Sequence, residues 1–212
     1  MISASILDLK EPKSLEISYL SKLDIDLIHV DVMDGIFVEN KSLDFYEYSN
    51  ILRNSYKPFD VHLMVSDVKK YIDEFSRIRP EYLTFHFEAV SDVRSIINYI
   101  KNLGIKVGMS IKPSTTIDEI QDYLSFLDLV LVMSVEPGKG GQNFIPNSSK
   151  KIDDLKIIRE KGNYNFLIEV DGGINDETIS NCINADICVV GSYITKNNYE
   201  TSINNLKKNF KK

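Results

Sequence analysis

The sequence predicts an α/β protein built as a (β/α)8 TIM barrel. Two observations carry this prediction: short β-branched runs alternate with longer amphipathic stretches, and most of the short runs are apolar throughout their centres. Continuously apolar runs are typical of parallel strands that are covered on both faces. Regular alternation of strand and helix implies a parallel sheet with right-handed crossovers, and eight such units close naturally into a barrel.

Eight runs qualify as strands. In chain order they are Ile2–Ile6, Leu27–Val32, Phe59–Leu63, Tyr82–Phe87, Lys106–Ile111, Leu129–Met133, Phe166–Val170 and Ile187–Val190. An open, doubly wound sheet is the alternative, but its G-x-G-x-x-G phosphate fingerprint does not follow the first strand. No Pro/Gly/Ser-rich linker divides the 212 residues, so we expect one domain over residues 1–212.

Amphipathic segments between these runs predict the helices. In Val68–Ile78 the apolar residues fall three or four positions apart, which places them on one face. The same pattern predicts helices at Val93–Leu103, Ile152–Arg159 and Ile179–Ile183. Gly104 stands where a C-terminal cap belongs, and Asn175 precedes two acids as an N-cap.

Composition excludes several functions. The net charge of −6 gives no basic footprint for nucleic acid, and no run of about 18 apolar residues predicts a membrane span. The N-terminus does not resemble a signal peptide, and Cys182 and Cys188 form no C-x-x-C pair, so a reducing cytoplasm is expected. Both cysteines are interpreted as packing residues, and the short run Lys211–Lys212 as solvated surface.

Candidate metal ligands stand at the ends of three predicted strands, where barrel enzymes place their chemistry. Alternation along a strand puts His29 and Asp31 on one face, and His62 and Asp171 end two further strands. A lone histidine in an apolar run is more often a satisfied core residue. Two histidines and two carboxylates together favour a site for Zn²⁺, Fe²⁺, Mn²⁺ or Co²⁺ over Ca²⁺.

Three glycine-containing turns at the same rim predict a phosphate site. They are Pro137–Gln142, which contains Gly138, Gly140 and Gly141; Gly172–Gly173; and Gly191–Ser192. Glycine lets backbone N–H groups approach an anion, and barrel phosphate sites commonly use the loops after strands seven and eight. Two questions stay open: whether His86 lines the pocket or serves plain packing or solvent contact, and whether Met33, Met64 and Met133 form a dry wall around the substrate or are core filler.

Several stretches in order along nearly the whole chain resemble the ribulose-phosphate 3-epimerase family. They are Ser5-Ile6-Leu7, His29-Val30-Asp31-Val32-Met33-Asp34-Gly35, Val61-His62-Leu63-Met64-Val65, Met133-Ser134-Val135-Glu136-Pro137-Gly138, Gly140-Gly141-Gln142 and Glu169-Val170-Asp171-Gly172-Gly173-Ile174-Asn175. The resemblance implies a barrel of the ribulose-phosphate-binding type. It also implies interconversion of D-ribulose 5-phosphate and D-xylulose 5-phosphate, a step of the pentose phosphate pathway, by metal-assisted proton transfer at C3.

The resemblance assigns roles to individual residues. His29, Asp31, His62 and Asp171 would bind one divalent metal ion, and Asp31 and Asp171 would also serve as the acid/base pair. The residues implied to bind substrate are Ser5, His62, Gly138, Gly140, Gly141, Gly172, Gly173, Gly191 and Ser192. The partners it implies are a small sugar phosphate and further copies of the chain, although the sequence shows no interface signature.

The chain departs from the family pattern at Ala4, Glu39, Lys112 and Lys139, none of which is a proposed ligand. Lys139, in the glycine turn, is either a phosphate contact or a solvated loop charge. Alternative functions are an epimerase acting on D-allulose 6-phosphate and a non-catalytic sugar-phosphate-binding barrel. Decarboxylases and aldolases on related barrels use Asp-x-Lys-x-x-Asp, and Asp31-Val32-Met33-Asp34 contains no lysine.

Overall fold

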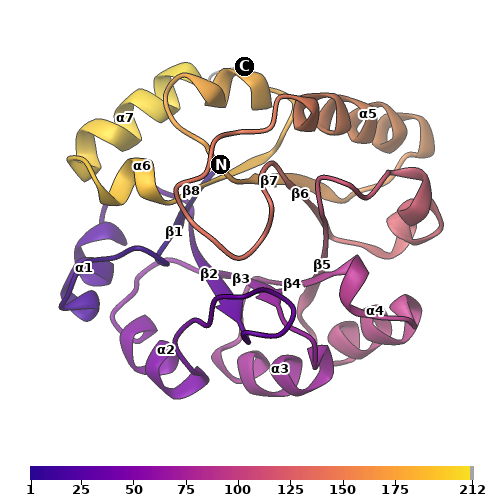
Figure 1. Cartoon of the computed structure of the whole chain (residues 1–212), viewed down its shortest axis with the longest axis horizontal. Helices are drawn as coiled ribbons and strands as arrows, with labels where there is room; N and C mark the ends of the chain where they lie inside the picture. The colour runs from indigo at the N-terminus through magenta and orange to yellow at the C-terminus, as the bar shows by residue number, and fades with distance from the viewer. Residues whose placement is uncertain (211–212) are drawn as a thin grey trace.

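The computed structural model describes residues 1–210 and shows a closed barrel of eight parallel strands. Each strand pairs with the next along the chain, and β1 pairs with β8 to complete the ring. The helical segments surround this ring (Figure 1). The fold is therefore the predicted (β/α)8 barrel. Lys211 and Lys212, which are the run interpreted as solvated surface and the last two residues of the expected domain, lie outside the described part.

The strands are β1 (Ile2–Ser5), β2 (Leu27–Met33), β3 (Phe59–Met64), β4 (Tyr82–His86), β5 (Lys106–Ile111), β6 (Leu129–Met133), β7 (Leu167–Asp171) and β8 (Ile187–Val190). The α-helices are α1 (Lys13–Leu20), α2 (Phe45–Leu52), α3 (Val68–Phe75), α4 (Val93–Asn102), α5 (Asn147–Gly162), α6 (Ser192–Thr195) and α7 (Tyr199–Asn209). Short 3₁₀ segments are η1 (Ser76–Ile78), η2 (Phe87–Ala89), η3 (Asp118–Phe126) and η4 (Thr178–Cys182).

All eight predicted strands are present, with ends that differ by at most one residue. The crossovers after β5 and β7 are 3₁₀ segments, so the prediction of an α-helix at Ile179–Ile183 is wrong in type. There the Asn175 side chain accepts hydrogen bonds from the backbone N–H groups of Glu177 and Thr178, each at 2.9 Å. Asn175 therefore caps the turn as predicted, but only five residues of tight helix follow.

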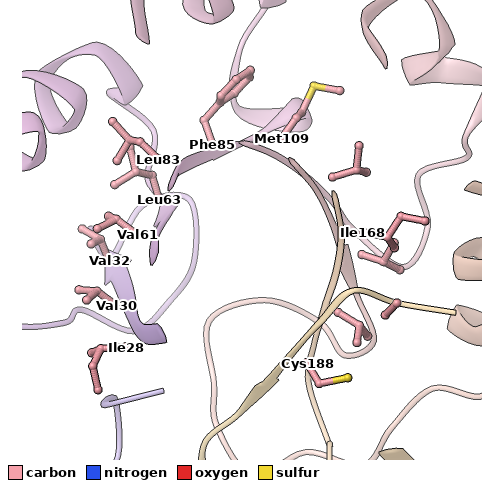
Figure 2. Packing of buried hydrophobic residues seen from close by; sticks show 14 of the residues in the cluster. Ile28, Val30, Val32, Val61, Leu63, Leu83, Phe85, Met109, Ile168 and Cys188 are labelled. Atoms are coloured by element: carbon pink, nitrogen blue, oxygen red, sulfur yellow. The ribbon is translucent and has the colours of Figure 1, made fainter. Parts of the chain in front are cut away.

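Alternation along the strands divides the side chains between two environments. Val30, Val61 and Leu63 lie on the outer side of the barrel wall, where they pack beneath the helices (Figure 2). Their neighbours in sequence face the barrel interior, because successive side chains on a strand point to opposite faces. The interior face of β2 and β3 therefore carries His29, Asp31 and His62.

The loop between β6 and α5, residues 134–146, extends across one end of the barrel (Figure 1). Its Gly138 carbonyl accepts a hydrogen bond of 2.8 Å from Asn40 Nδ2 in the loop after β2. The loop after β2 is tied in turn to the loop after β3, because Asp34 Oδ2 accepts from the Ser66 N–H at 2.6 Å. These loops therefore form a connected rim at the carboxyl ends of the strands.

Candidate active site

Four side chains converge inside the barrel at this rim. His29, Asp31, His62 and Asp171 each offer one ligand atom, and these four atoms all lie within 4.8 Å of one another. Asp31 stands opposite His62 in the β2–β3 register, and its Oδ1 lies 3.3 Å from both His29 Nε2 and His62 Nδ1. The structure therefore brings together all four predicted ligands.

The donor set fits a divalent cation. His29 Nε2 is buried and makes no hydrogen bond, although it lies 3.3 Å from Asp31 Oδ1. An orphaned imidazole nitrogen facing a carboxylate is costly in a dry interior, and a cation between them would satisfy both groups. Two imidazole nitrogens and two carboxylates suit borderline transition-metal ions such as zinc, iron, manganese or cobalt.

A layer of buried acids supports His29 from below. His29 Nδ1 lies 2.7 Å from Asp60 Oδ2, so this ring nitrogen has a carboxylate partner while Nε2 faces the cluster. Glu169 lies beside both residues. His29, Asp60 and Glu169 each offer one atom that could bind a metal, and these three atoms lie within 4.8 Å of one another. Asp60 and Glu169 were not among the sequence-predicted site residues.

The charge states of these groups depend on one another. Burial acts to lower the pKa of His29, but the Asp60 and Asp31 carboxylates outweigh it and raise the pKa well above its usual value. Burial opposes ionisation of Asp31, yet its contacts with His29 and His62 hold the pKa well below its usual range. Burial, reinforced by the Asp31 charge, raises the pKa of Asp171 to about 6. The two carboxylates of the cluster therefore have pKa values shifted in opposite directions.

His62 makes a second contact away from the cluster. Its Nε2 lies 2.9 Å from Nε2 of His86, and His86 Nδ1 lies 3.0 Å from Glu88 Oε2. His86 is fully buried, so solvent contact is excluded as its role. His86 is not among the residues that line the pocket, so packing is the interpretation that holds, and its packing partner is the site residue His62.

A pocket opens above the cluster. It is lined by Asp31 and Asp171, by Ser5, whose Oγ donates a 2.8 Å hydrogen bond to Asp31 Oδ2, and by Met33, Met64 and Met133. The glycine turns complete the lining with Gly138, Gly140, Gly141, Gly172, Gly173, Gly191 and Ser192. The pocket thus joins the carboxylates to all three predicted phosphate turns, with methionine side chains in its wall.

Two of these glycines hold the loop after β6 in place. Gly173 has φ +65°, and a Cβ on it would stand 2.3 Å from the Phe144 backbone nitrogen. Gly172 has φ +121°, and its Cβ would stand 2.4 Å from Val135 Cγ2. Both residues must be glycine for the loop after β6 to rest against the end of β7.

Two lysine side chains lie near the glycine turns. Lys196, just beyond α6, places its Nζ 3.6 Å from the position a Cβ would take on Gly141. It also lines a neighbouring hollow with Gly173 and Ser192. Lys139 lines the main pocket from the loop after β6. Lys196 was missed from the sequence although it stands four residues after the predicted turn Gly191–Ser192, because only the fold brings its side chain to Gly141.

Fold and site together define a (β/α)8-barrel protein whose interior cluster could hold a divalent cation. A family model described as "Ribulose-phosphate 3 epimerase family" matches residues 1–195. The chain belongs to this family, and the sequence-based resemblance is confirmed.

Relatives named ribulose-phosphate 3-epimerase match most of the chain. The ribulose-phosphate 3-epimerase of Methanocaldococcus jannaschii is 40% identical over 195 residues, which cover 91% of this chain and 82% of the relative. The enzyme of the same name from Bacillus subtilis is 39% identical over 182 residues, 84% of each chain. The Treponema pallidum ribulose-phosphate 3-epimerase is 39% identical over 176 residues, covering 82% of this chain and 81% of the relative.

Solved structures confirm the fold at low sequence identity. The 3-hexulose-6-phosphate synthase of Salmonella typhimurium superposes with a TM-score of 0.70 at 19% identity, covering 99% of this chain and 97% of that chain. Tryptophan synthase of Mycobacterium tuberculosis superposes with a TM-score of 0.71 at 12% identity, covering 99% of this chain and 91% of that chain. Across residues 1–210, no helix has the length and apolar character needed to cross a membrane.

Proposed function

We propose that the chain is a D-ribulose 5-phosphate 3-epimerase, which interconverts D-ribulose 5-phosphate and D-xylulose 5-phosphate. Family membership supports the activity, and one observation carries the mechanism: Asp31 and Asp171, from separate strands, line the same pocket beside two histidines. Epimerisation at a carbon next to a ketone needs a base on one face and an acid on the other. The two carboxylates supply this pair.

The metal ligands of the proposal are His29, Asp31, His62 and Asp171. A bound divalent cation would act as a Lewis acid that stabilises negative charge developing on the substrate oxygens. Zinc, iron, manganese and cobalt all suit the donor set.

Proton transfer is assigned to the carboxylates themselves. One of Asp31 and Asp171 removes the C3 proton, and the other returns a proton on the opposite face; their roles exchange with the direction of reaction. Ser5 holds Asp31 in place through its 2.8 Å hydrogen bond. The methionines in the pocket wall exclude water from the carbon acid while the charge develops.

The phosphate group is assigned to the glycine turns at the other end of the pocket. Gly172, Gly173, Gly191 and Ser192 follow β7 and β8, where barrels commonly bind phosphate, and Gly138, Gly140 and Gly141 approach from the loop after β6. Binding energy from the phosphate positions C3 between the carboxylates. The same reasoning predicts poor turnover of the unphosphorylated pentulose.

Three further proposals concern the whole chain. Residues 1–212 form one domain, since no linker sequence separates the barrel elements. The enzyme works in the cytoplasm, in line with its two free, buried cysteines. It acts on a small sugar phosphate and assembles as a homo-oligomer, with no nucleic acid or membrane among its partners.

The decisive experiment follows deuterium incorporation at C3 of D-ribulose 5-phosphate in D₂O by NMR, with and without a chelator. The proposal expects metal-dependent exchange together with formation of D-xylulose 5-phosphate. D-allulose 6-phosphate is run in parallel, and faster exchange on it would reassign the substrate. Asp171→Asn should retain the fold and lose nearly all exchange, so near-normal turnover in this variant would overturn the two-carboxylate scheme.

A further inference from the structure

We propose that His86 and Glu88 are positioning residues that keep the ring proton of His62 on Nε2 and so direct its Nδ1 lone pair into the metal cluster. The inference rests on the proposed metal site of the epimerase. It concerns which nitrogen of His62 can bind a cation, because a neutral imidazole carries one proton and offers its lone pair only at the other nitrogen.

The three side chains form a buried chain that leads away from the cluster. His62 and His86 are both fully buried, with ring centroids 5.0 Å apart and their Nε2 atoms at 2.9 Å. Glu88 follows β4 and reaches back to His86 Nδ1 at 3.0 Å. Two nitrogens at 2.9 Å must share one proton, so one of the two histidines donates here and the other accepts.

Glu88 decides which histidine donates. Its Oε1 accepts hydrogen bonds from the Lys112 N–H at 2.7 Å and from the Thr115 hydroxyl. These donors, together with His86, outweigh burial and lower the pKa of Glu88 to about 2. A carboxylate only accepts, so His86 Nδ1 donates to it. His86 Nε2 then accepts the proton of His62 Nε2, and His62 Nδ1 is left free toward Asp31.

The comparison with His29 explains why a second residue is needed. His29 presents Nε2 to the cluster and has Asp60 at Nδ1, so a carboxylate fixes its ring proton directly. His62 presents the opposite nitrogen, Nδ1, and its outer partner is another imidazole, which can donate or accept. Asp31 Oδ1, 3.3 Å from Nδ1, favours the ring proton on that nitrogen, and Glu88, acting through His86, is the group that draws the proton to Nε2 instead.

Glu88→Gln is the sharpest perturbation, because it preserves the shape of the side chain and reverses the direction of the hydrogen bonds that run through His86 to His62. The Lys112 N–H and the Thr115 hydroxyl both donate to the Oε1 position, so the amide oxygen must occupy it. The amide NH₂ then faces His86 Nδ1 and makes that nitrogen an acceptor. His86 donates from Nε2, His62 accepts there, and the ring proton of His62 moves to Nδ1, where it blocks the cation.

The test uses full-length protein with ¹⁵N-labelled histidine and Zn²⁺ alone as the probe. Long-range ¹H–¹⁵N correlation spectra should show His62 protonated at Nε2 in metal-free wild type, and Zn²⁺ should shift its Nδ1. In Glu88→Gln the proton should appear on Nδ1, and Zn²⁺ affinity from chelator competition should fall roughly 10–100-fold. Glu119→Gln, the same change at an exposed carboxylate that bonds Thr116, should leave both readings unchanged.

The outcomes separate this inference from the proposed function. A wild-type His62 that carries its proton on Nδ1 overturns the inference even if the variants fail to fold. So does a folded Glu88→Gln protein with wild-type Zn²⁺ affinity and tautomer. If wild type binds Zn²⁺ through His62 Nδ1 but exchanges no proton at C3, the proposed function fails while the positioning role stands. Glu88→Asp, which keeps an acceptor, should restore the wild-type tautomer.

Discussion

Gly173→Ala tests whether the loop after β6 is held in place by the end of β7. Gly173 adopts φ +65°, where a Cβ costs roughly 1–2 kcal/mol. That Cβ would also stand 2.3 Å from the Phe144 nitrogen and 2.8 Å from its Cα, so the loop backbone must move. Overpacking of this kind costs about 1–3 kcal/mol, so we expect a total loss of about 2–5 kcal/mol.

Gly104→Ala is the matched control. Gly104 has a similar φ of +75°, follows helix α4, and a Cβ on it would meet nothing within 4 Å. We expect this variant to lose only the backbone contribution of about 1–2 kcal/mol and to keep wild-type kinetics. Gly173→Ala should lose more and should also raise KM, because the displaced loop carries Gly138, Gly140 and Gly141.

The assay combines urea unfolding with KM for D-ribulose 5-phosphate. The larger loss of unfolding free energy and the raised KM should occur together in Gly173→Ala and be absent from Gly104→Ala. Equal stability losses in the two variants, with unchanged KM in both, would refute the reasoning. The loop would then not depend on close approach to Gly173.

Three further predictions follow from the site. Metal binding should release about one more proton below pH 6 than above it, because Asp171, with its pKa raised to about 6, must lose its proton to bind a cation. Calorimetry in buffers of different ionisation enthalpy measures this release, and a release that does not change around pH 6 would contradict the prediction. Lys196→Met should raise KM for the phosphorylated substrate severalfold, most strongly at low salt, where the attraction between lysine and phosphate is least screened. An unchanged KM in Lys139→Ala would show that Lys139 does not contact the phosphate. Tyr48→Phe should lower the unfolding free energy by about 1 kcal/mol, since the buried Tyr48 hydroxyl donates a 2.7 Å bond to the Asp31 carbonyl; urea unfolding with no loss would exclude that contribution.

The sequence predicted the strands well because parallel barrel strands are buried on both faces and read as uninterrupted apolar runs. The helices were harder to predict. Lys13–Leu20, Phe45–Leu52 and Tyr199–Asn209 were not predicted, and α5 begins five residues before its predicted start at Ile152. Outer helices of a barrel bury only one face, so their apolar pattern is diluted by exposed residues such as Leu15 and Tyr46.

The four candidate metal ligands could be chosen from sequence because each is a polar residue within an apolar strand run or directly after one, and alternation places His29 and Asp31 on one face. Asp60 and Glu169 could not, since their meeting depends on the register and closure of the barrel, which join β3 to β7 across the interior. The role of His86 is hidden for the same reason. Its partner His62 lies on the neighbouring strand, and only the folded geometry shows which ring nitrogens meet.

The layer of acids beneath the cluster has a consequence for the charge inside the barrel. Glu169 and His29 both retain a proton to higher pH than usual, Glu169 because of burial and the adjacent Asp60 charge. Protons on these two groups therefore reduce the charge buried beneath the cluster in the metal-free barrel. A cation that bound the cluster would exchange for protons rather than add its full charge to the interior.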